Sequence, residues 1–245
     1  MGIISRMPLA GDACVLDVGC GDGRLSRELA RRVPKGRVVG IDSSPDMVTL
    51  ARDSFPDADN LRFECMDARR IDLPEKFDVA FSNAVLHWFR DHDAFLSGLR
   101  RVMRNGASIH FSFGGKGNAG EVVTALFRTI AQDRWRGFFP GEAFRPENLP
   151  YAFFSPEEYR ALLERNGFEP VSVDLVRREM RQAGPDALAG WIRTTWMPFT
   201  RQVPETERGE FIARIVDEFA SDHPAGPDGA LVVAMFALVV RAKAR

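Results

Sequence analysis

A glycine-rich stretch near the amino terminus holds the residues best suited to binding a small molecule. "VLDVGCGDGRLS" (15–26) begins with apolar residues, places glycines at positions 19, 21 and 23, and then turns polar and helical. A loop of this kind, between a strand and a helix, brings backbone N–H groups close to a ligand. The loop departs from the GxGxxG pattern of dinucleotide sites, because Arg24 stands where that pattern has its third glycine. The glycines alone therefore leave the ligand open.

Three aspartates narrow the choice. Asp17 ends the first predicted strand, where a carboxylate would repel a diphosphate but can pair with an ammonium group. Asp42 ends the second strand and can accept hydrogen bonds from both hydroxyls of a ribose, unless it only caps the following turn. Asp67 follows the third strand and can accept from an adenine amino group, although aspartate is also common in such loops. An adenosine joined to an amino acid satisfies all three aspartates, and S-adenosylmethionine is such a molecule.

The elements that must position these residues alternate along the first half of the chain. Short β-branched or aromatic runs predict strands at 14–18, 37–41, 61–65, 77–81 and 107–113, and amphipathic stretches predict helices at 23–32, 45–54 and 93–103. This alternation is typical of a parallel sheet covered by helices. Ser44 and Pro45 fit the cap and the first residue of one helix.

The second half of the chain is mostly helical. Helices are predicted at 121–132, in "SPEEYRALLERNGF" (155–168), at 185–195 and at 205–220, with strands near 171–176 and 230–241. The aromatic residues between 135 and 154 are expected mainly to form the core of this part. Because strands bracket the helices, we expect a helical insertion that roofs the carboxyl ends of the sheet, where open α/β sheets bind ligands.

Composition excludes several classes of partner. The chain has 245 residues and a formal net charge of -1, so it has no overall attraction to nucleic acid or to an anionic membrane. Its longest apolar run, at 230–240, is too short to span a bilayer. Three cysteines without a CxxC motif favour a reducing compartment, and we expect a cytoplasmic protein without a bound metal. A small-molecule partner and a monomer or homodimer are expected.

Four ordered motifs resemble the class I, seven-strand S-adenosylmethionine-dependent methyltransferases. They are "VLDVGCGDG", "VVGIDSSPDMV", "CMDARRIDLPEKFDVAFSNAVLHW" and "VMRNGASIHFS". The resemblance implies a Rossmann-like, doubly wound α/β sheet of seven mostly parallel strands with an antiparallel last strand. It implies a single domain over 1–245, with a core of about 12–115, 168–178 and 228–245 and a helical cap of about 116–167 and 184–222.

The same resemblance implies a set of cofactor contacts. The methionine end of S-adenosylmethionine, and of its product S-adenosylhomocysteine, would lie on Asp17, Gly19 and Gly21, and the ribose on Asp42. The remaining expected contacts are Met47 on the adenine face, Asp67 and Ala68 on the adenine edge, Asn83 near the sulfonium, and the adjoining Cys20 and Ser43. Such enzymes usually begin with a helical segment that closes over the site, whereas only residues 1–13 precede the first predicted strand here. The cap or an upstream segment is expected to do this.

The rest of the chain resembles the trans-aconitate and juvenile-hormone-acid methyltransferase type, which methylates carboxylates of small molecules. "NAVLHWFRDHDAFLSGL", "FFSPEEYRALLERNGF" and "WIRTTWMPF" carry this likeness. His87, Trp88 and Arg193 are the expected acceptor-positioning residues, with Arg134 and Arg136 as other candidate partners for a carboxylate. His87 is open to three roles: a general base, a donor that orients a carboxylate, or an ordinary packed side chain.

The acceptor is expected to be a carboxylic acid with an apolar portion. Such a group is already ionised at neutral pH, so its methylation needs positioning rather than a strong base. A phenol, an amine, a carbon or an acyl-carrier-bound carboxylate is the alternative acceptor. A nucleoside-binding module without turnover is the alternative from another class, and a nicotinamide dehydrogenase is disfavoured by Asp17 and Arg24.

Overall fold

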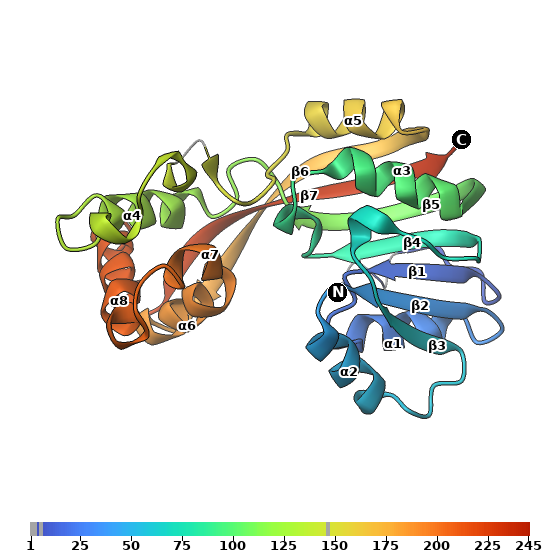
Figure 1. Ribbon diagram of the computed structural model, residues 1–245, viewed down its shortest axis with the longest axis horizontal. Helices are drawn as coiled ribbons and strands as arrows, with labels where there is room; N and C mark the ends of the chain where they lie inside the picture. Colours follow the sequence, from blue (N-terminus) through green and yellow to red (C-terminus); the bar gives the residue numbers. More distant parts are fainter. Residues whose placement is uncertain (1–3, 5–6, 146–147) are drawn as a thin grey trace. The chain divides into compact units, whose positions relative to one another are not determined.

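The computed structural model describes residues 4, 7–145 and 148–245, so the segment 1–13 lies partly outside the described residues. A seven-stranded sheet has the order β3-β2-β1-β4-β5-β7-β6 (Figure 1). The strands are β1 (Cys14–Val18), β2 (Arg37–Asp42), β3 (Leu61–Cys65), β4 (Phe77–Asn83), β5 (Met103–Gly114), β6 (Phe168–Gln182) and β7 (Leu231–Ala244). Strands β1 to β5 pair in parallel, and β7 runs antiparallel to β5. The predicted fold class is confirmed.

The chain forms two compact units. Unit 1 comprises Met1–Lys116, Ala152–Val176 and Ala237–Arg245, and unit 2 comprises Gly117–Tyr151 and Arg177–Phe236. Strands β6 and β7 therefore each contribute residues to both units.

The side chains of β1 point alternately to the two faces of the sheet in unit 1, and different helices cover these faces. Val15 packs with Leu29 of α1 (Arg24–Arg32), whereas Leu16 and Val18 belong to the core that includes Phe95 of α3 (His92–Val102). Helix α2 (Pro45–Ser54) forms a smaller core around Phe63 of β3. Because successive side chains of a strand point to opposite faces, the helices divide between the two faces.

Helix α5 (Pro156–Arg165) lies in unit 1, whereas the sequence analysis placed 116–167 in the cap, and the expected extent of the cap stays a prediction. Its Tyr159, Leu162 and Leu163 are buried in the same core as α3. Ser155 caps the helix in a reciprocal capping box with Glu158. The sequence pattern located the helix, and its apolar stripe packs in the core that the sheet shares with α3.

Unit 2 contains α4 (Gly120–Ile130), α6 (Pro185–Thr195), α7 (Met197–Thr200) and α8 (Glu205–Asp222). The Trp135 and Phe139 rings lie 5.2 Å and 5.4 Å from that of Phe211 on α8, so the expectation that these aromatics form core is confirmed. The predicted role of the helical part as a roof stays a prediction. Among the described residues, none of the helices has the length and apolarity that crossing a membrane requires.

Candidate functional site

The carboxyl ends of β1 and β4 mark a reversal of strand order. From β1 the chain adds β2 and β3 on one side, and β4 then pairs with the other side of β1. Asp17 is in register with Gly40 of β2 and Phe81 of β4, so it stands between these strands near their carboxyl ends. Open α/β sheets bind ligands outside the carboxyl ends of the strands at such a reversal. The predicted cofactor residues of β1, β2 and β4 therefore gather at one edge of unit 1.

Backbone hydrogen bonds fix the glycine loop to the end of β2. The N–H groups of Gly19 and Cys20 both donate to the carbonyl of Ile41, at 2.7 Å and 3.0 Å. Gly19 has φ +73°, and a Cβ there would lie 2.4 Å from a methyl carbon of Val85. Gly21 has φ +54°, but a Cβ there would have no atom within 4 Å. Gly19 is thus required by conformation and packing, whereas Gly21 presents backbone to open space.

Asp42 joins the loop to the start of α2. One oxygen of its carboxylate accepts from the N–H of Gly21 at 3.0 Å, and the other accepts from the N–H of Ser44 at 2.9 Å. The turn-capping role considered from the sequence is therefore present. A carboxylate has about four acceptor positions, so these two bonds leave capacity for ribose hydroxyls.

Asp17 is a buried carboxylate, with 2% of its surface exposed. The Ser26 hydroxyl, on the first turns of α1, donates to it at 2.6 Å. Burial raises the pKa of Asp17 from 3.8 to about 7; the Ser26 hydrogen bond lowers that pKa, and the nearby Asp42 charge raises it. Among the described residues Asp17 forms no salt bridge. A cation that binds beside a buried carboxylate, such as an ammonium group, stabilises its ionised form.

The residues expected to contact adenine, after β3 and on α2, differ in burial and in hydrogen bonding. The Asp67 carboxylate already accepts from the backbone and guanidinium of Arg69, which hold the pKa of Asp67 below its usual range. Ala68 starts the adjoining 3-10 turn and is half-buried. Met47 lies on α2 and is 42% exposed, so its side chain is not part of the hydrophobic core. The adenine roles of all three stay predictions.

The remaining predicted contacts flank the loop. Cys20 is buried, and burial raises the pKa of its thiol, which keeps it protonated. Ser43 is exposed directly after Asp42. Asn83 ends β4 opposite Ser112, and the next residue, Ala84, has φ +60°. A left-handed alanine is uncommon and redirects the chain at the carboxyl end of β4.

His87 and Trp88 lie in a 3-10 turn, Leu86–Trp88, that follows β4. Their rings stack with centroids 5.8 Å apart, and Trp88 is 38% exposed. The Gly114 N–H donates to Nδ1 of His87 at 3.2 Å, so the neutral ring carries its proton on Nε2. Burial and, to a smaller extent, the nearby His92 lower the pKa of His87 to about 4. At neutral pH the His87 side chain is therefore an uncharged hydrogen-bond donor.

Arg193 lies on α6 in unit 2, whereas the residues above belong to unit 1. Its side chain is exposed and lines a cavity of about 420 Å³ within unit 2. Arg134 and Arg136, the other candidate partners for a carboxylate, form salt bridges with Glu210 and Asp133. Of the three arginines, only Arg193 has no salt bridge among the described residues.

Sequence reasoning missed the residues that hold the predicted ones in place. Ser26 orients Asp17, Val85 packs on Gly19, and the Gly114 N–H fixes the tautomer of His87. The sequence offered a signal for Ser26, because it stands one helical turn before the apolar Leu29 in the predicted helix 23–32, and a hydroxyl buried on that face needs a partner. Val85 and Gly114 gave no such signal, since their roles depend on contacts between separate segments.

Comparisons with known proteins agree on one family. A family model described as "Methyltransferase domain" matches residues 15–106. The trans-aconitate 2-methyltransferase of Methylobacterium nodulans is 30% identical over 239 residues, covering 94% of this chain and 86% of that protein. An uncharacterized methyltransferase of Schizosaccharomyces pombe is 34% identical over 181 residues, 72% of this chain and 66% of that protein.

Solved structures share the fold. An O-methyltransferase from a polyketide synthase of Brevibacillus brevis, in complex with S-adenosyl-L-homocysteine, superimposes with a TM-score of 0.59 at 10% identity. The match covers 99% of this chain and 70% of that one. At this identity the likeness concerns the arrangement of the elements alone.

Proposed function

This chain belongs to the class I S-adenosylmethionine-dependent methyltransferases, of the trans-aconitate methyltransferase type, and we propose that it methylates a carboxylate oxygen of a small organic acid. When bound, S-adenosylmethionine supplies a sulfonium methyl group, which a carboxylate takes to give a methyl ester and S-adenosylhomocysteine. The cofactor is implied by the family. The acceptor class is our proposal, supported by the state of His87 and by the relatives named as trans-aconitate 2-methyltransferases.

The residues at the strand ends of unit 1 fit the cofactor. Asp17 is a buried carboxylate without a salt bridge among the described residues, which suits an ammonium group. Asp42 retains acceptor capacity beside the loop, and Gly21 leaves space that a side chain would fill. We assign Asp17 to the amino-acid end and Asp42 to the ribose. Met47, Asp67, Ala68 and Asn83 are the proposed contacts to adenine and the sulfonium region.

The state of His87 carries the proposed acceptor class. A general base needs an available lone pair and a pKa near the working pH. The Nδ1 lone pair of His87 accepts the Gly114 N–H, and its pKa of about 4 keeps the ring neutral. A carboxylate needs no deprotonation at neutral pH. His87 and Trp88 are therefore proposed to position the acceptor, with His87 acting as a donor rather than as a base.

Calorimetric titration with S-adenosylhomocysteine tests the cofactor assignment. We expect Asp42→Ala to weaken binding at least about tenfold, which corresponds to about 1.4 kcal/mol. Asp46→Ala is the matched control, because Asp46 is an exposed aspartate on the same segment and forms no salt bridge among the described residues. Equal affinities of Asp42→Ala and the wild-type protein would remove Asp42 from the ribose site.

Methyl transfer from labelled S-adenosylmethionine to a panel of small acids, including trans-aconitate, tests the acceptor. We expect an alkali-labile methyl ester. At saturating S-adenosylmethionine, where the pH dependence of cofactor binding no longer limits the reaction, we expect a rate that stays flat from about pH 6 to 8, because the acceptor and His87 keep their charge states over that range. An alkali-stable product with phenols or amines, formed faster as pH rises, would replace the carboxylate proposal. Detectable cofactor binding without transfer to any acceptor would favour a binding module instead.

A further inference from the structure

A cavity of about 420 Å³ in unit 2 is lined by three arginines. Arg193 comes from α6, Arg201 directly follows α7, and Arg208 comes from the first turns of α8. Glu205, at the first residue of α8, is the acidic side chain in the lining. The volume falls within the range of about 300–1,000 Å³ that is typical of small-molecule sites. Three cations and one anion leave an excess of positive charge around a space large enough for a small ligand.

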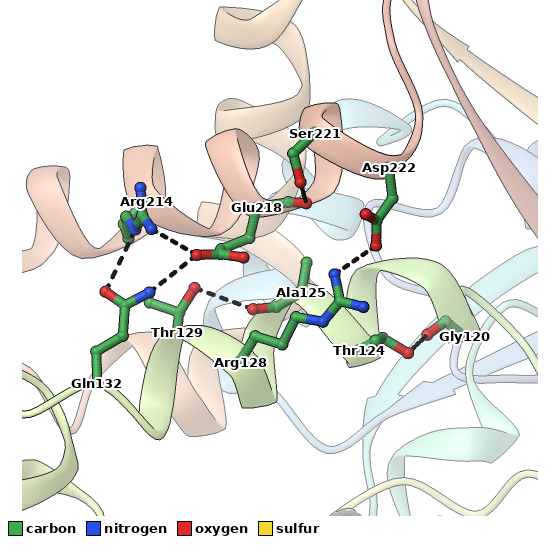
Figure 2. Close-up of polar contacts among 10 residues, drawn as sticks. All are labelled: Gly120, Thr124, Ala125, Arg128, Thr129, Gln132, Arg214, Glu218, Ser221 and Asp222. Atoms are coloured by element: carbon green, nitrogen blue, oxygen red, sulfur yellow. Dashed lines mark hydrogen bonds and ion pairs between the residues drawn. The ribbon is translucent and has the colours of Figure 1, made fainter.

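These three arginines have no salt bridge among the described residues, unlike most arginines of unit 2. The other described arginines of the unit, apart from Arg178, are paired with carboxylates: Arg128, Arg134, Arg136, Arg145, Arg177, Arg181 and Arg214. Figure 2 shows such pairing along α4 and α8, where Arg128 meets Asp222 and Arg214 meets Glu218. The cavity thus gathers three of the four arginines that lack a salt bridge.

A second cavity of unit 2 offers a contrast. Its volume is about 430 Å³, and its lining includes Glu121, Arg177 and Asp222. There the Glu121 carboxylate accepts from the Ala234 N–H at 3.0 Å, while Arg177 and Asp222 are held in salt bridges. Each of these three charged groups therefore has a partner within the protein. Two cavities of similar size thus differ in their lining: arginines without a salt bridge among the described residues line only the first of them.

Arg208 is held in position from the protein side. Its Nε–H donates to the carbonyl of Thr200 at 3.0 Å, and the side chain is half-buried. Carbonyl contacts orient a guanidinium without neutralising it, so its charge is retained for an anion. Arg193 and Arg201 are exposed and can adapt to a ligand. Guanidinium groups bind carboxylates in a planar, two-pronged geometry that a compact ammonium group does not provide.

We propose that this cavity is a binding site for a small di- or tricarboxylate, whose carboxylate groups pair with Arg193, Arg201 and Arg208. Several guanidiniums around one cavity suit an anion with more than one charged group. The ligand is either the methyl acceptor, an identification that rests on the proposed function, or a separate effector of the same chemistry. Binding itself can be measured without methyl transfer, so this proposal and the proposed function can fail separately.

Calorimetry with citrate as the probe tests the site. We expect citrate to bind, acetate to bind far more weakly, and citrate binding to weaken as salt is raised, because the interaction is ionic. Arg193→Gln and Arg201→Gln should each weaken citrate binding about tenfold, the effect of losing one charge-assisted contact. Arg178→Gln is the matched control, since Arg178 is also exposed and lacks a salt bridge among the described residues, but does not line the cavity. It should leave citrate affinity unchanged.

Glu205→Gln provides a test of opposite sign. Removing the acidic side chain from the lining should tighten citrate binding about two- to fivefold, because the carboxylate repels the ligand. Thermal unfolding of each variant shows whether the fold is retained. Absence of citrate binding to the wild-type protein at millimolar concentration would overturn the proposal. The proposal would also be overturned if Arg193→Gln and Arg201→Gln bound citrate as tightly as the control Arg178→Gln.

Kinetics separate the two sources of ligand. If the tricarboxylate is the acceptor, Arg201→Gln raises KM for a tricarboxylate about tenfold but leaves KM for a monocarboxylate nearly unchanged. If it is an effector, citrate changes the rate of methylation of a monocarboxylate without competing with it. Either result supports the site. An equal rise in KM for both acceptors would contradict selective binding of the additional carboxylates.

Discussion

In the glycine loop of unit 1, backbone groups hold the polar atoms in place, whereas the arginine cavity of unit 2 is formed by side chains. The N–H of Gly21 binds Asp42, and the N–H groups of Gly19 and Cys20 bind the carbonyl of Ile41. Around the cavity, Arg193, Arg201 and Arg208 come from the end of α6, the end of α7 and the start of α8. The loop is held by hydrogen bonds within the protein itself. The cavity brings together arginines whose positive charges an anionic ligand can neutralise.

The contrast extends to the sign and burial of the charges. Asp17 is buried, and its burial raises the pKa to about 7, so the loop region favours a cation. Arg193 and Arg201 are exposed cations, so the cavity favours an anion. We therefore expect binding at the loop to depend on pH and binding at the cavity to depend on salt. Three further experiments test this difference, taken from the largest expected effect to the smallest.

Alanine substitutions at Gly19 and Gly21 should separate packing from ligand space. Gly19→Ala should lower the free energy of unfolding by about 2–4 kcal/mol, because it adds both left-handed strain and a clash with Val85. Gly21→Ala should cost only the strain, about 1–2 kcal/mol, yet weaken S-adenosylhomocysteine binding at least about tenfold. Urea unfolding and calorimetry measure the two effects. Wild-type affinity in Gly21→Ala would show that the space beside Gly21 is not ligand space.

The affinity for S-adenosylhomocysteine should rise with pH through the pKa of Asp17, about 7. Below that pH the carboxyl is protonated, and each further unit should weaken binding up to about tenfold. Without ligand, the contribution of Asp17 to the free energy of unfolding should fall as pH rises from about 4 to 7. The reason is that the folded state retains a proton that the unfolded state has released.

Asp17→Asn is the control for both pH effects. It should remove the pH dependence of binding and that of unfolding attributable to this group, because an amide does not titrate in this range. Calorimetry at a series of pH values and denaturant unfolding of the ligand-free protein measure them. An affinity that is constant from about pH 6 to 8 in the wild-type protein would contradict the role of Asp17.

The smallest effect is expected at a paired arginine of unit 2. Arg128→Gln breaks the exposed salt bridge with Asp222 in Figure 2 and should lower the free energy of unfolding by no more than about 1 kcal/mol. Its citrate affinity should stay at the wild-type value, since Arg128 does not line the arginine cavity. A large loss of citrate binding in Arg128→Gln would mean that overall charge, rather than the cavity, attracts the anion.

Local patterns predicted the elements of both units closely. Strand β1 occupies 14–18 and helix α2 occupies 45–54, as expected, because hydrophobic period, Ser44 and Pro45 define them locally. The expected helix 93–103 and strand 107–113 were less accurate, since β5 begins at Met103 and includes the left-handed Gly106. The pairing of β5 with β4 is irregular there, and that pairing is a long-range interaction that a local pattern does not report.

The sequence by itself determined the fold class, the glycine loop and the aspartates at the strand ends, because these features depend on the order of short segments whose patterns are local. Only the tertiary structure decided the state of each group: the buried bond between Asp17 and Ser26, the neutral tautomer of His87 and the placement of α5 on the sheet. It also decided which arginines are neutralised and which share a cavity. Burial and charge pairing arise from segments that are distant in the chain, so their energies are set when those segments pack together.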